Sequence, residues 1–218
     1  AQLVAMHYSQ GLLIDCGSTT TDIICLNQGA PQLTAFDDQG RLSSGELLYT
    51  GVIRTPLMAI CQKLPFQGQW QSVAAELFAT SGDCWCILNE IDALQIHDKS
   101  ADGKDWQHNN CQRRLARMLG TDKDLYSAAT WQHVAQWFTE QQTQQIHNAC
   151  MQVLSAHRDM DEQAPVIGAG VGRFLARKIA ERLQRPFHDF NTLLNTHDTA
   201  AAYAPASALA LLAQQQFT

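Results

Sequence analysis

Two aspartates and a run of hydroxyl side chains form a short polar stretch between two apolar segments near the start of the sequence. Its chemically active residues are Asp15, Gly17, Ser18, Thr19, Thr20 and Asp22. The flanking apolar residues predict two strands joined by a tight turn. Backbone N–H groups and hydroxyls in such a turn can donate to phosphate oxygens, and a carboxylate can bind Mg²⁺ or order a water molecule. We therefore predict a phosphate-binding hairpin, with an ordinary Ser/Thr-rich turn as the alternative.

A glycine-rich stretch late in the sequence is the second candidate. Gly168, Gly170 and Gly172 follow an apolar strand and precede a helix, where a nucleotide can lie against the helix N-terminus. One alternative is that the glycines allow close packing of strand and helix. Another is a dinucleotide-binding Rossmann unit, with Asp189 as its ribose-binding acid. The spacing argues against that fold, because Arg173 stands where its fingerprint has glycine and too few residues follow Asp189.

The elements that position these stretches follow from apolar periodicity and turn residues. Strands are predicted over 11–16, 21–27, 32–36, 165–167 and 186–190. Residues 72–79 fit a strand or a helix, and we favour the strand. Helices are predicted over 43–48, 173–183 and 199–215. Another predicted helix begins at Pro56, and a separate one ends at Leu119. Residues 131–154 are predicted to form one helix or two. Residues 80–130 are interpreted as a helical insertion. Strands followed by strand–helix alternation indicate the α/β class.

The composition predicts a globular protein, since 45% of the residues are hydrophobic and 17% are charged. A net charge of −6 argues against a nucleic-acid partner. Seven cysteines scattered among apolar residues predict reduced thiols and a cytoplasmic protein. We find neither an apolar run long enough to span a membrane nor a signal peptide, and therefore expect no membrane partner. Arg113, Arg114 and Arg117 are interpreted as the solvated face of a helix.

Together, the two stretches resemble the second half of the superfamily of actin, hexokinase and the heat-shock chaperone ATPases. Its second phosphate motif is a hairpin of the form D-x-G-x-x-x-x-D, matched from Asp15 to Asp22, and its adenosine motif is a turn similar to Gly168–Gly172. The resemblance implies one ribonuclease H-like domain over 1–218 with a mixed sheet, equivalent to the second half of the superfamily fold, and the helical insertion over about 80–130. The helix from Thr199 corresponds to the superfamily's closing helix.

Further blocks are similar to the hydantoinase/oxoprolinase-related proteins linked to tetrahydromethanopterin one-carbon metabolism. These blocks are Gly11–Ile24, Tyr49–Leu57, Glu76–Thr80, Ala101–Lys104, Arg113–Met118 and Gly168–Ala176. The resemblance implies an enzyme of methanofuran or methanofuran-like carrier biosynthesis, which joins a furan-methyl diphosphate to an amine and releases diphosphate. Family members usually carry a further N-terminal portion with the first phosphate motif, and none precedes Gly11. We therefore expect a missing N-terminal half or a homo-oligomer to complete the site.

On this resemblance, Asp15 is the candidate Mg²⁺ ligand, and Asp22 braces the turn or joins the metal shell. Glu76 and Asp83 are candidates to position or deprotonate the amine, and a capping or solvated carboxylate is the alternative for each. Arg54 is a candidate to bind diphosphate, with a surface ion pair as the alternative. The inferred Mg²⁺ would neutralise the charge of the departing diphosphate.

Two rival functions use the same residues. One is ATP-dependent phosphoryl transfer, as in the small-molecule kinases of the superfamily, because that reaction also requires stabilisation of polyphosphate charge. The other is a non-catalytic nucleotide-binding module, which applies if the chain is truncated.

Overall fold

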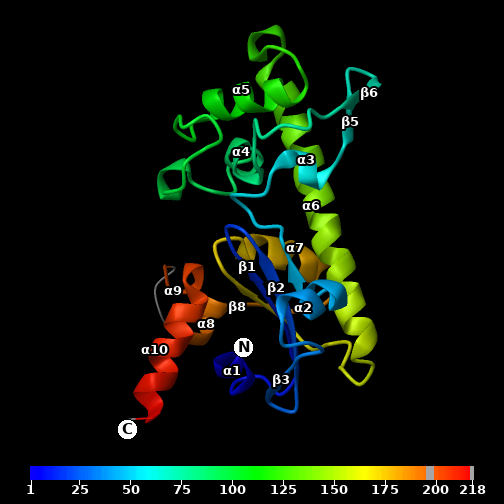
Figure 1. Cartoon of the computed structure of the whole chain (residues 1–218). Coiled ribbons are helices and arrows are strands. Elements are labelled where there is room, and N and C mark those ends of the chain that lie inside the picture. The colour runs from blue at the N-terminus through cyan, green and yellow to red at the C-terminus, as the bar shows by residue number, and fades with distance from the viewer. Residues whose placement is uncertain (195–198, 217–218) are drawn as a thin grey trace. The chain divides into compact units, whose positions relative to one another are not determined.

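The computed structural model of the chain describes residues 1–194 and 199–216 and contains two compact units (Figure 1). The first unit consists of 1–49 and 145–218, and the second of 50–144. Residues 80–130 all belong to the second unit, whereas the predicted single domain over 1–218 with an insertion stays a prediction. Within the described residues, no helix combines the length and the apolar character that crossing a membrane requires.

The first unit is built on a mixed six-stranded sheet. Its strands are β1 (Gly11–Cys16), β2 (Thr21–Asn27), β3 (Ala30–Gln32), β4 (Leu47–Leu48), β7 (Val166–Ala169) and β8 (Phe187–Asp189). The main order is β3-β2-β1-β7-β8, and β4 pairs with β2. β2 is antiparallel to β1, β3 and β4, whereas β7 is parallel to β1 and β8. Sheet and helices together confirm the predicted α/β class.

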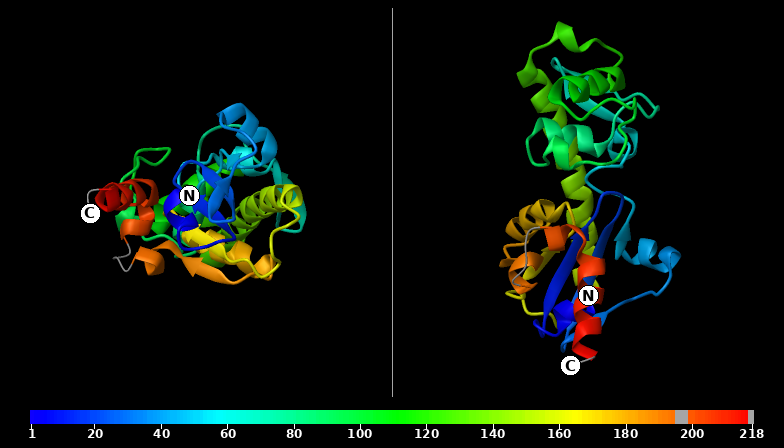
Figure 2. Two further views of the ribbon diagram at one scale, coloured as in Figure 1. Left: turned by 90° about the horizontal axis from the view of Figure 1, so that it is seen from below. Right: turned by 90° about the vertical axis from the view of Figure 1, so that its left-hand side faces the viewer.

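Six helices of the described residues lie wholly within the first unit. They are α1 (Gln2–Ala5), α2 (Asp38–Ser44), α7 (Arg173–Arg182), α8 (Phe190–Leu194), α9 (Thr199–Ala202) and α10 (Ala204–Gln216). Leu13 and Ile167 pack in one apolar cluster with Leu3, Ala201 and Ala204. Figure 2 draws α10 in red in two further views, and its Leu211 and Leu212 pack against the same cluster.

The second unit combines helices with a two-stranded sheet. Its elements are α3 (Leu57–Ile60), β5 (Lys63–Phe66), β6 (Gln69–Ser72), α4 (Ser81–Ile87), η1 (Ala93–Gln95), α5 (His108–Met118) and η2 (Lys123–Leu125). α6 (Ala128–Ala156) begins in this unit and ends in the first. α6 is one continuous helix of 29 residues, so the prediction of one helix over 131–154 is confirmed and that of two helices is wrong. All seven cysteines are free, as predicted, and six of them are buried.

Two of the predicted elements are wrong. The predicted helix over 43–48 is replaced by α2, because Asp37 accepts a hydrogen bond from the Gly40 N–H at 2.7 Å and caps the helix earlier. Gly45, with φ +80°, then ends α2, and the following residues form β4. The predicted strand over 72–79 is wrong because β6 ends at Ser72 and irregular backbone follows up to α4. The third predicted strand is shifted and occupies the short β3.

Candidate functional site

The predicted pair of strands joined by a tight turn is confirmed, whereas phosphate binding by this hairpin stays a prediction. In the antiparallel pairing of β1 and β2, Asp15 lies opposite Asp22 and Cys16 opposite Thr21. The Gly17 N–H donates to the carbonyl oxygen of Thr20 at 2.8 Å and closes the turn. Thr21 Oγ1 donates to Cys16 Sγ at 3.3 Å just below it. The two carboxylates therefore stand side by side on one face of the sheet, next to the tip.

The tip carries hydrogen-bond donors that the rest of the described chain does not use. Ser18 Oγ and Thr19 Oγ1 are 3.5 Å apart, at the limit of a hydrogen bond. In the part of the chain that the structure describes, the backbone N–H groups of Ser18, Thr19 and Thr20 make no hydrogen bond. Three consecutive amides and three hydroxyls are thus available to a ligand that brings acceptor oxygens.

The structure brings the glycine-rich turn into contact with the hairpin. Because β1 and β7 are parallel and Asp15 pairs with Ala169, the chain leaves β7 beside Asp15. The Gly172 N–H donates to the Cys16 carbonyl oxygen at 2.8 Å. At Gly170, φ is +82°, and a Cβ would lie 2.2 Å from the Cys16 carbonyl oxygen and 2.6 Å from Asp15 Oδ1. Only glycine fits there, so the backbone of this turn lies in direct contact with the Asp15 carboxylate.

Close packing explains much of the glycine pattern. A Cβ at Gly168 would lie 2.6 Å from Phe187 Cε2 and 3.1 Å from the Cβ of Ala176. The Gly170 N–H donates to the Ala201 carbonyl oxygen at 2.8 Å. The amides of Gly170 and Gly172 are therefore both occupied within the unit. Nucleotide binding by this turn stays a prediction, and the packing alternative accounts for Gly168 and Gly170.

Asp15 is the electrostatically unusual residue of the hairpin. Its side chain is half-buried, and no hydrogen bond to its carboxylate occurs within the described residues. Burial, with a further contribution from the charge of Asp22, raises the pKa of Asp15 from 3.8 to about 6. The neighbouring Asp22, in contrast to Asp15, accepts a hydrogen bond at its Oδ1 from Arg41 Nη2 at 2.7 Å. Removing a hydrogen-bond acceptor from water without giving it a donor costs free energy. The Asp15 carboxylate can therefore bind a cationic or proton-donating ligand favourably.

This environment fits a Mg²⁺ ion held together with a phosphate ligand. Mg²⁺ commonly takes one or two carboxylates and completes its shell with phosphate oxygens and waters. Within the described residues, no group of three or more His, Cys, Asp or Glu side chains could hold a metal. The single unpaired carboxylate of Asp15 is consistent with a metal that arrives with its phosphate, and not with an all-protein cage.

Replacing Asp15 by Asn is expected to stabilise the first unit in a pH-dependent way. The folded pKa of Asp15 lies above its ordinary value, so its contribution to stability is present below about pH 4 and is lost as the pH rises through about 6. We expect Asp15→Asn to raise the free energy of unfolding by about 1–3 kcal/mol at pH 7.5, and by almost nothing at pH 4. Urea unfolding followed by circular dichroism measures both values. If the change in the free energy of unfolding caused by Asp15→Asn is the same at both pH values, the raised pKa of Asp15 is contradicted. The control is Asp38→Asn, which replaces an exposed carboxylate.

The remaining sequence candidates lie in the second unit, where they make no hydrogen bonds with one another. Glu76 is exposed, and among the described residues its Oε1 accepts only from the neighbouring Leu77 N–H, at 3.1 Å. Arg54 donates from Nε to Asp98 Oδ1 at 2.8 Å and also from Nη2 to the same oxygen. This is the surface ion pair that was the alternative to diphosphate binding.

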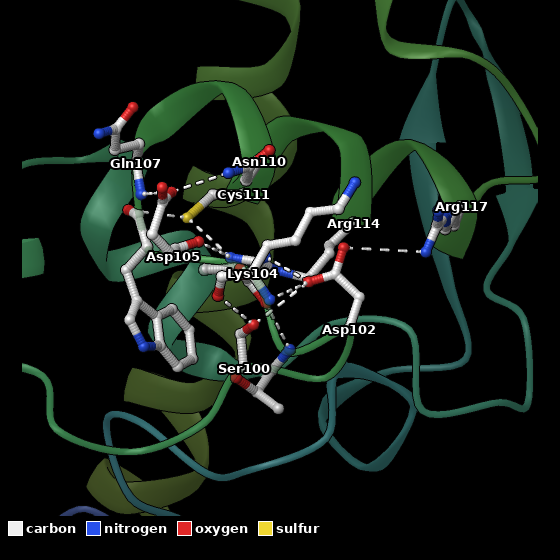
Figure 3. A network of polar contacts seen from close by, with 12 residues as sticks. Ser100, Asp102, Lys104, Asp105, Gln107, Asn110, Cys111, Arg114 and Arg117 are labelled. Carbon is white, nitrogen blue, oxygen red and sulfur yellow. Dashed lines mark hydrogen bonds and ion pairs between the residues drawn. The ribbon is translucent and has the colours of Figure 1, made fainter.

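Asp83 is a buried structural carboxylate. Its Oδ2 accepts from the Thr80 N–H at 2.9 Å at the start of α4, and its Oδ1 accepts from Arg114 Nε at 2.7 Å. Arg114 also donates to Asp102 Oδ1 at 2.8 Å and to the Asp105 carbonyl oxygen at 3.2 Å (Figure 3). Both Asp83 oxygens are thus engaged, which favours the capping alternative over proton transfer.

Two important arginines were misjudged or missed from the sequence. Arg114 is fully buried, so its assignment to a solvated face is wrong. It lies on the same face of α5 as the buried Cys111, Leu115 and Met118, and this periodicity could have identified it. Arg41 was missed because the predicted helix started too late. The capping residue Asp37, followed by Gly45 at the end of α2, was the available signal.

Comparisons with known proteins agree with the family resemblance of the sequence blocks. The sequence model of one family, hydantoinase/oxoprolinase, matches residues 1–216. A Methanococcus vannielii protein named (4-{4-[2-(gamma-L-glutamylamino)ethyl]phenoxymethyl}furan-2-yl)methanamine synthase is 36% identical over 129 residues, 59% of this chain and 58% of that protein. A protein of the same name from Methanocaldococcus jannaschii is 34% identical over 114 residues, 52% of this chain and 34% of that protein. The matched region covers less than two thirds of either relative.

Proposed function

Because the chain belongs to the hydantoinase/oxoprolinase family, we propose that it acts in the biosynthesis of methanofuran or a methanofuran-like one-carbon carrier. The proposed reaction joins a furan-methyl diphosphate to a second substrate and releases diphosphate. The observation that carries the proposal is the hairpin tip, where three unused amides and three hydroxyls lie beside the unpaired Asp15 carboxylate. Donors of this kind suit diphosphate oxygens.

The names of the relatives suggest a change to the expected nucleophile. In the product that both names describe, the furan methylene carries a phenoxy oxygen, and the methanamine is a separate group. We therefore propose a phenol oxygen as the nucleophile in place of the amine expected from the sequence. The bond from this oxygen to the methylene carbon forms, the carbon–oxygen bond to diphosphate breaks, and the phenol loses its proton.

The chain's own residues would bind and orient the leaving group. The Ser18–Thr20 amides and hydroxyls would donate to the diphosphate oxygens, and Asp15 would hold the Mg²⁺ bound to them. Bound Mg²⁺ would supply neutralisation of the negative charge that develops on the leaving diphosphate. Gly170 would let the turn approach Asp15 and fix its carboxylate.

The strand order supports the finer proposal of a ribonuclease H-like first unit, with three antiparallel strands followed by two parallel ones. The chain matches only part of each relative, so the activity of a whole relative is part of this proposal. A further N-terminal segment is the proposed source of the first phosphate motif, and a second copy of the chain is the alternative by which a homo-oligomer would complete the site.

Thermal unfolding with Mg²⁺ and inorganic diphosphate tests the proposed function. Saturation at 100 times the dissociation constant stabilises a folded protein by about 2.7 kcal/mol, so we expect a rise of several degrees in the midpoint. For Asp15→Asn, we expect that at least about tenfold more ligand is needed for the same rise in the midpoint. This holds although the variant without ligand is more stable than the original chain. The control Asp38→Asn should respond like the original chain.

Each other outcome has a definite meaning. No response to Mg²⁺ with diphosphate would refute the diphosphate site. A response to Mg²⁺ with ATP but none to Mg²⁺ with diphosphate would favour the kinase alternative over the transferase.

A further inference from the structure

Arg41 separates the chemical roles of the two hairpin carboxylates. Its Nη2 donates to Asp22 Oδ1 at 2.7 Å and to the Glu46 carbonyl oxygen at 3.2 Å. The side chains of Arg41 and Asp22 are only 19% and 32% exposed, so water screens their ion pair incompletely. Asp15, directly across the strand pair, accepts no hydrogen bond from any side chain within the described residues, and the cation that acts on it is the Ala1 ammonium group, through charge alone.

The surrounding structure holds Arg41 in place. Asp37 caps α2 at its start, and the close approach of Gly40 to Ala35 leaves no room for a Cβ at Gly40. Glu46 is buried at the other end of α2, where its carboxylate accepts from the Thr34 N–H at 2.6 Å and from Ser44 Oγ at 3.0 Å. Arg41 therefore extends from a helix that is anchored at both ends, unlike a freely rotating surface arginine.

Without Arg41, the hairpin would offer a pair of carboxylates to a cation. Residues directly opposite in an antiparallel pair have Cβ atoms about 4.5–5.5 Å apart, close enough for their carboxylates to share one ion. Such a pair would attract a bare divalent metal. With Arg41 bound to Asp22, only the Asp15 carboxylate remains, and a single carboxylate is a weak ligand set for Mg²⁺.

We propose that Arg41 withholds Asp22 from metal coordination, so that the hairpin binds a divalent cation only together with diphosphate. This inference rests on the proposed function, because it assumes that the hairpin is the diphosphate site. Arg41 is thus a positioning residue that sets ligand specificity. The metal–diphosphate complex is bound, the free metal lacks sufficient ligands, and free diphosphate is repelled by Asp15.

The binding of Mn²⁺, measured with and without inorganic diphosphate, tests this proposal. Electron paramagnetic resonance measures the concentration of the unbound ion. The unaltered chain should bind Mn²⁺ at least about tenfold more tightly with diphosphate than without it. Arg41→Gln removes the guanidinium charge, frees Asp22 and should raise the affinity for Mn²⁺ alone about tenfold or more. Arg41→Lys keeps the charge and should not show this gain.

Two further variants exclude a general effect of removing an arginine. Arg54→Gln frees Asp98 in the second unit from a comparable ion pair and should gain no affinity for Mn²⁺ alone. The double variant Asp22→Asn/Arg41→Gln should lose the gain, because the second carboxylate is then absent. Asp22→Asn alone should keep its affinity for Mn²⁺ with diphosphate, whereas Asp15→Asn should lose it. This last comparison remains decisive if Arg41→Gln does not fold.

The outcomes separate the inference from the function on which it rests. Equal affinity of the unaltered chain for Mn²⁺ with and without diphosphate, or loss of binding in Asp22→Asn, would overturn the role of Arg41. Failure to bind Mn²⁺ under either condition would overturn the diphosphate site itself.

Discussion

Replacing Arg114 by Met lowers the free energy of unfolding of the second unit by about 3–5 kcal/mol, the range for breaking one side of a buried ion pair. Arg114 and Asp83 have side-chain exposures of 0%, so the change leaves Asp83 without its partner and without water. Burial already raises the pKa of Asp83 against the opposing effect of Arg114. Urea unfolding measured by tryptophan fluorescence reports the loss, since the five tryptophans all lie within 50–144.

Two controls identify the buried charge as the cause. Arg117→Met removes an arginine from the same helix, but Arg117 is 53% exposed and 3.9 Å from Asp102, so its loss should cost less than about 1 kcal/mol. Asp83→Asn/Arg114→Met should recover part of the lost stability, because no unpaired charge then stays buried. A double variant that is less stable than Arg114→Met would contradict the ion-pair explanation.

Gly170→Ala is expected to destabilise the first unit by about 2–5 kcal/mol. A left-handed backbone costs an L-residue about 1–2 kcal/mol, and overpacking commonly adds about 1–3 kcal/mol. Here the added Cβ would meet the Cys16 carbonyl oxygen at 2.2 Å, and backbone must move to relieve that contact. Urea unfolding followed by circular dichroism measures the loss. Any folded Gly170→Ala protein should also show a weaker response to Mg²⁺ with diphosphate, because Asp15 is displaced.

Gly68→Ala isolates the backbone contribution. Gly68 has φ +78°, close to the value at Gly170, but a Cβ there would meet nothing within 4 Å. It should therefore cost only about 1–2 kcal/mol. Equal losses at the two positions would show that the contact with the hairpin contributes nothing.

Local patterns were sufficient to predict most of the first unit. The apolar runs on both sides of the polar stretch predicted the bounds of β1 and β2, and the apolar run before Gly168 predicted β7. Parallel pairing of β1 with β7 then puts the ends of both strands, and both polar stretches, at one edge of the sheet. This juxtaposition follows from topology, which is why sequence-level reasoning could expect it.

The partners of charged side chains could not be read in the same way. Asp83 and Arg114 are 31 positions apart, and Asp22 and Arg41 are 19 apart, so no local rule connects them. Each pairing depends on how a helix packs within its unit. Sequence reasoning therefore found Asp83 as a candidate acid, whereas its burial beside Arg114 gives it a structural role.

The pairing of Leu12 with Val166 has a consequence for the growing chain. During synthesis, β1 and β2 can form their hairpin before β7 has been made, because only a short turn separates the two strands in the sequence. The other edge of β1 stays unpaired until the ribosome has released β7, and an unpaired edge is where strands of other molecules attach. The second unit lies entirely between these two strands in the sequence and can fold in the meantime. The contact between Gly170 and Asp15 is thus completed only after the whole second unit has been made.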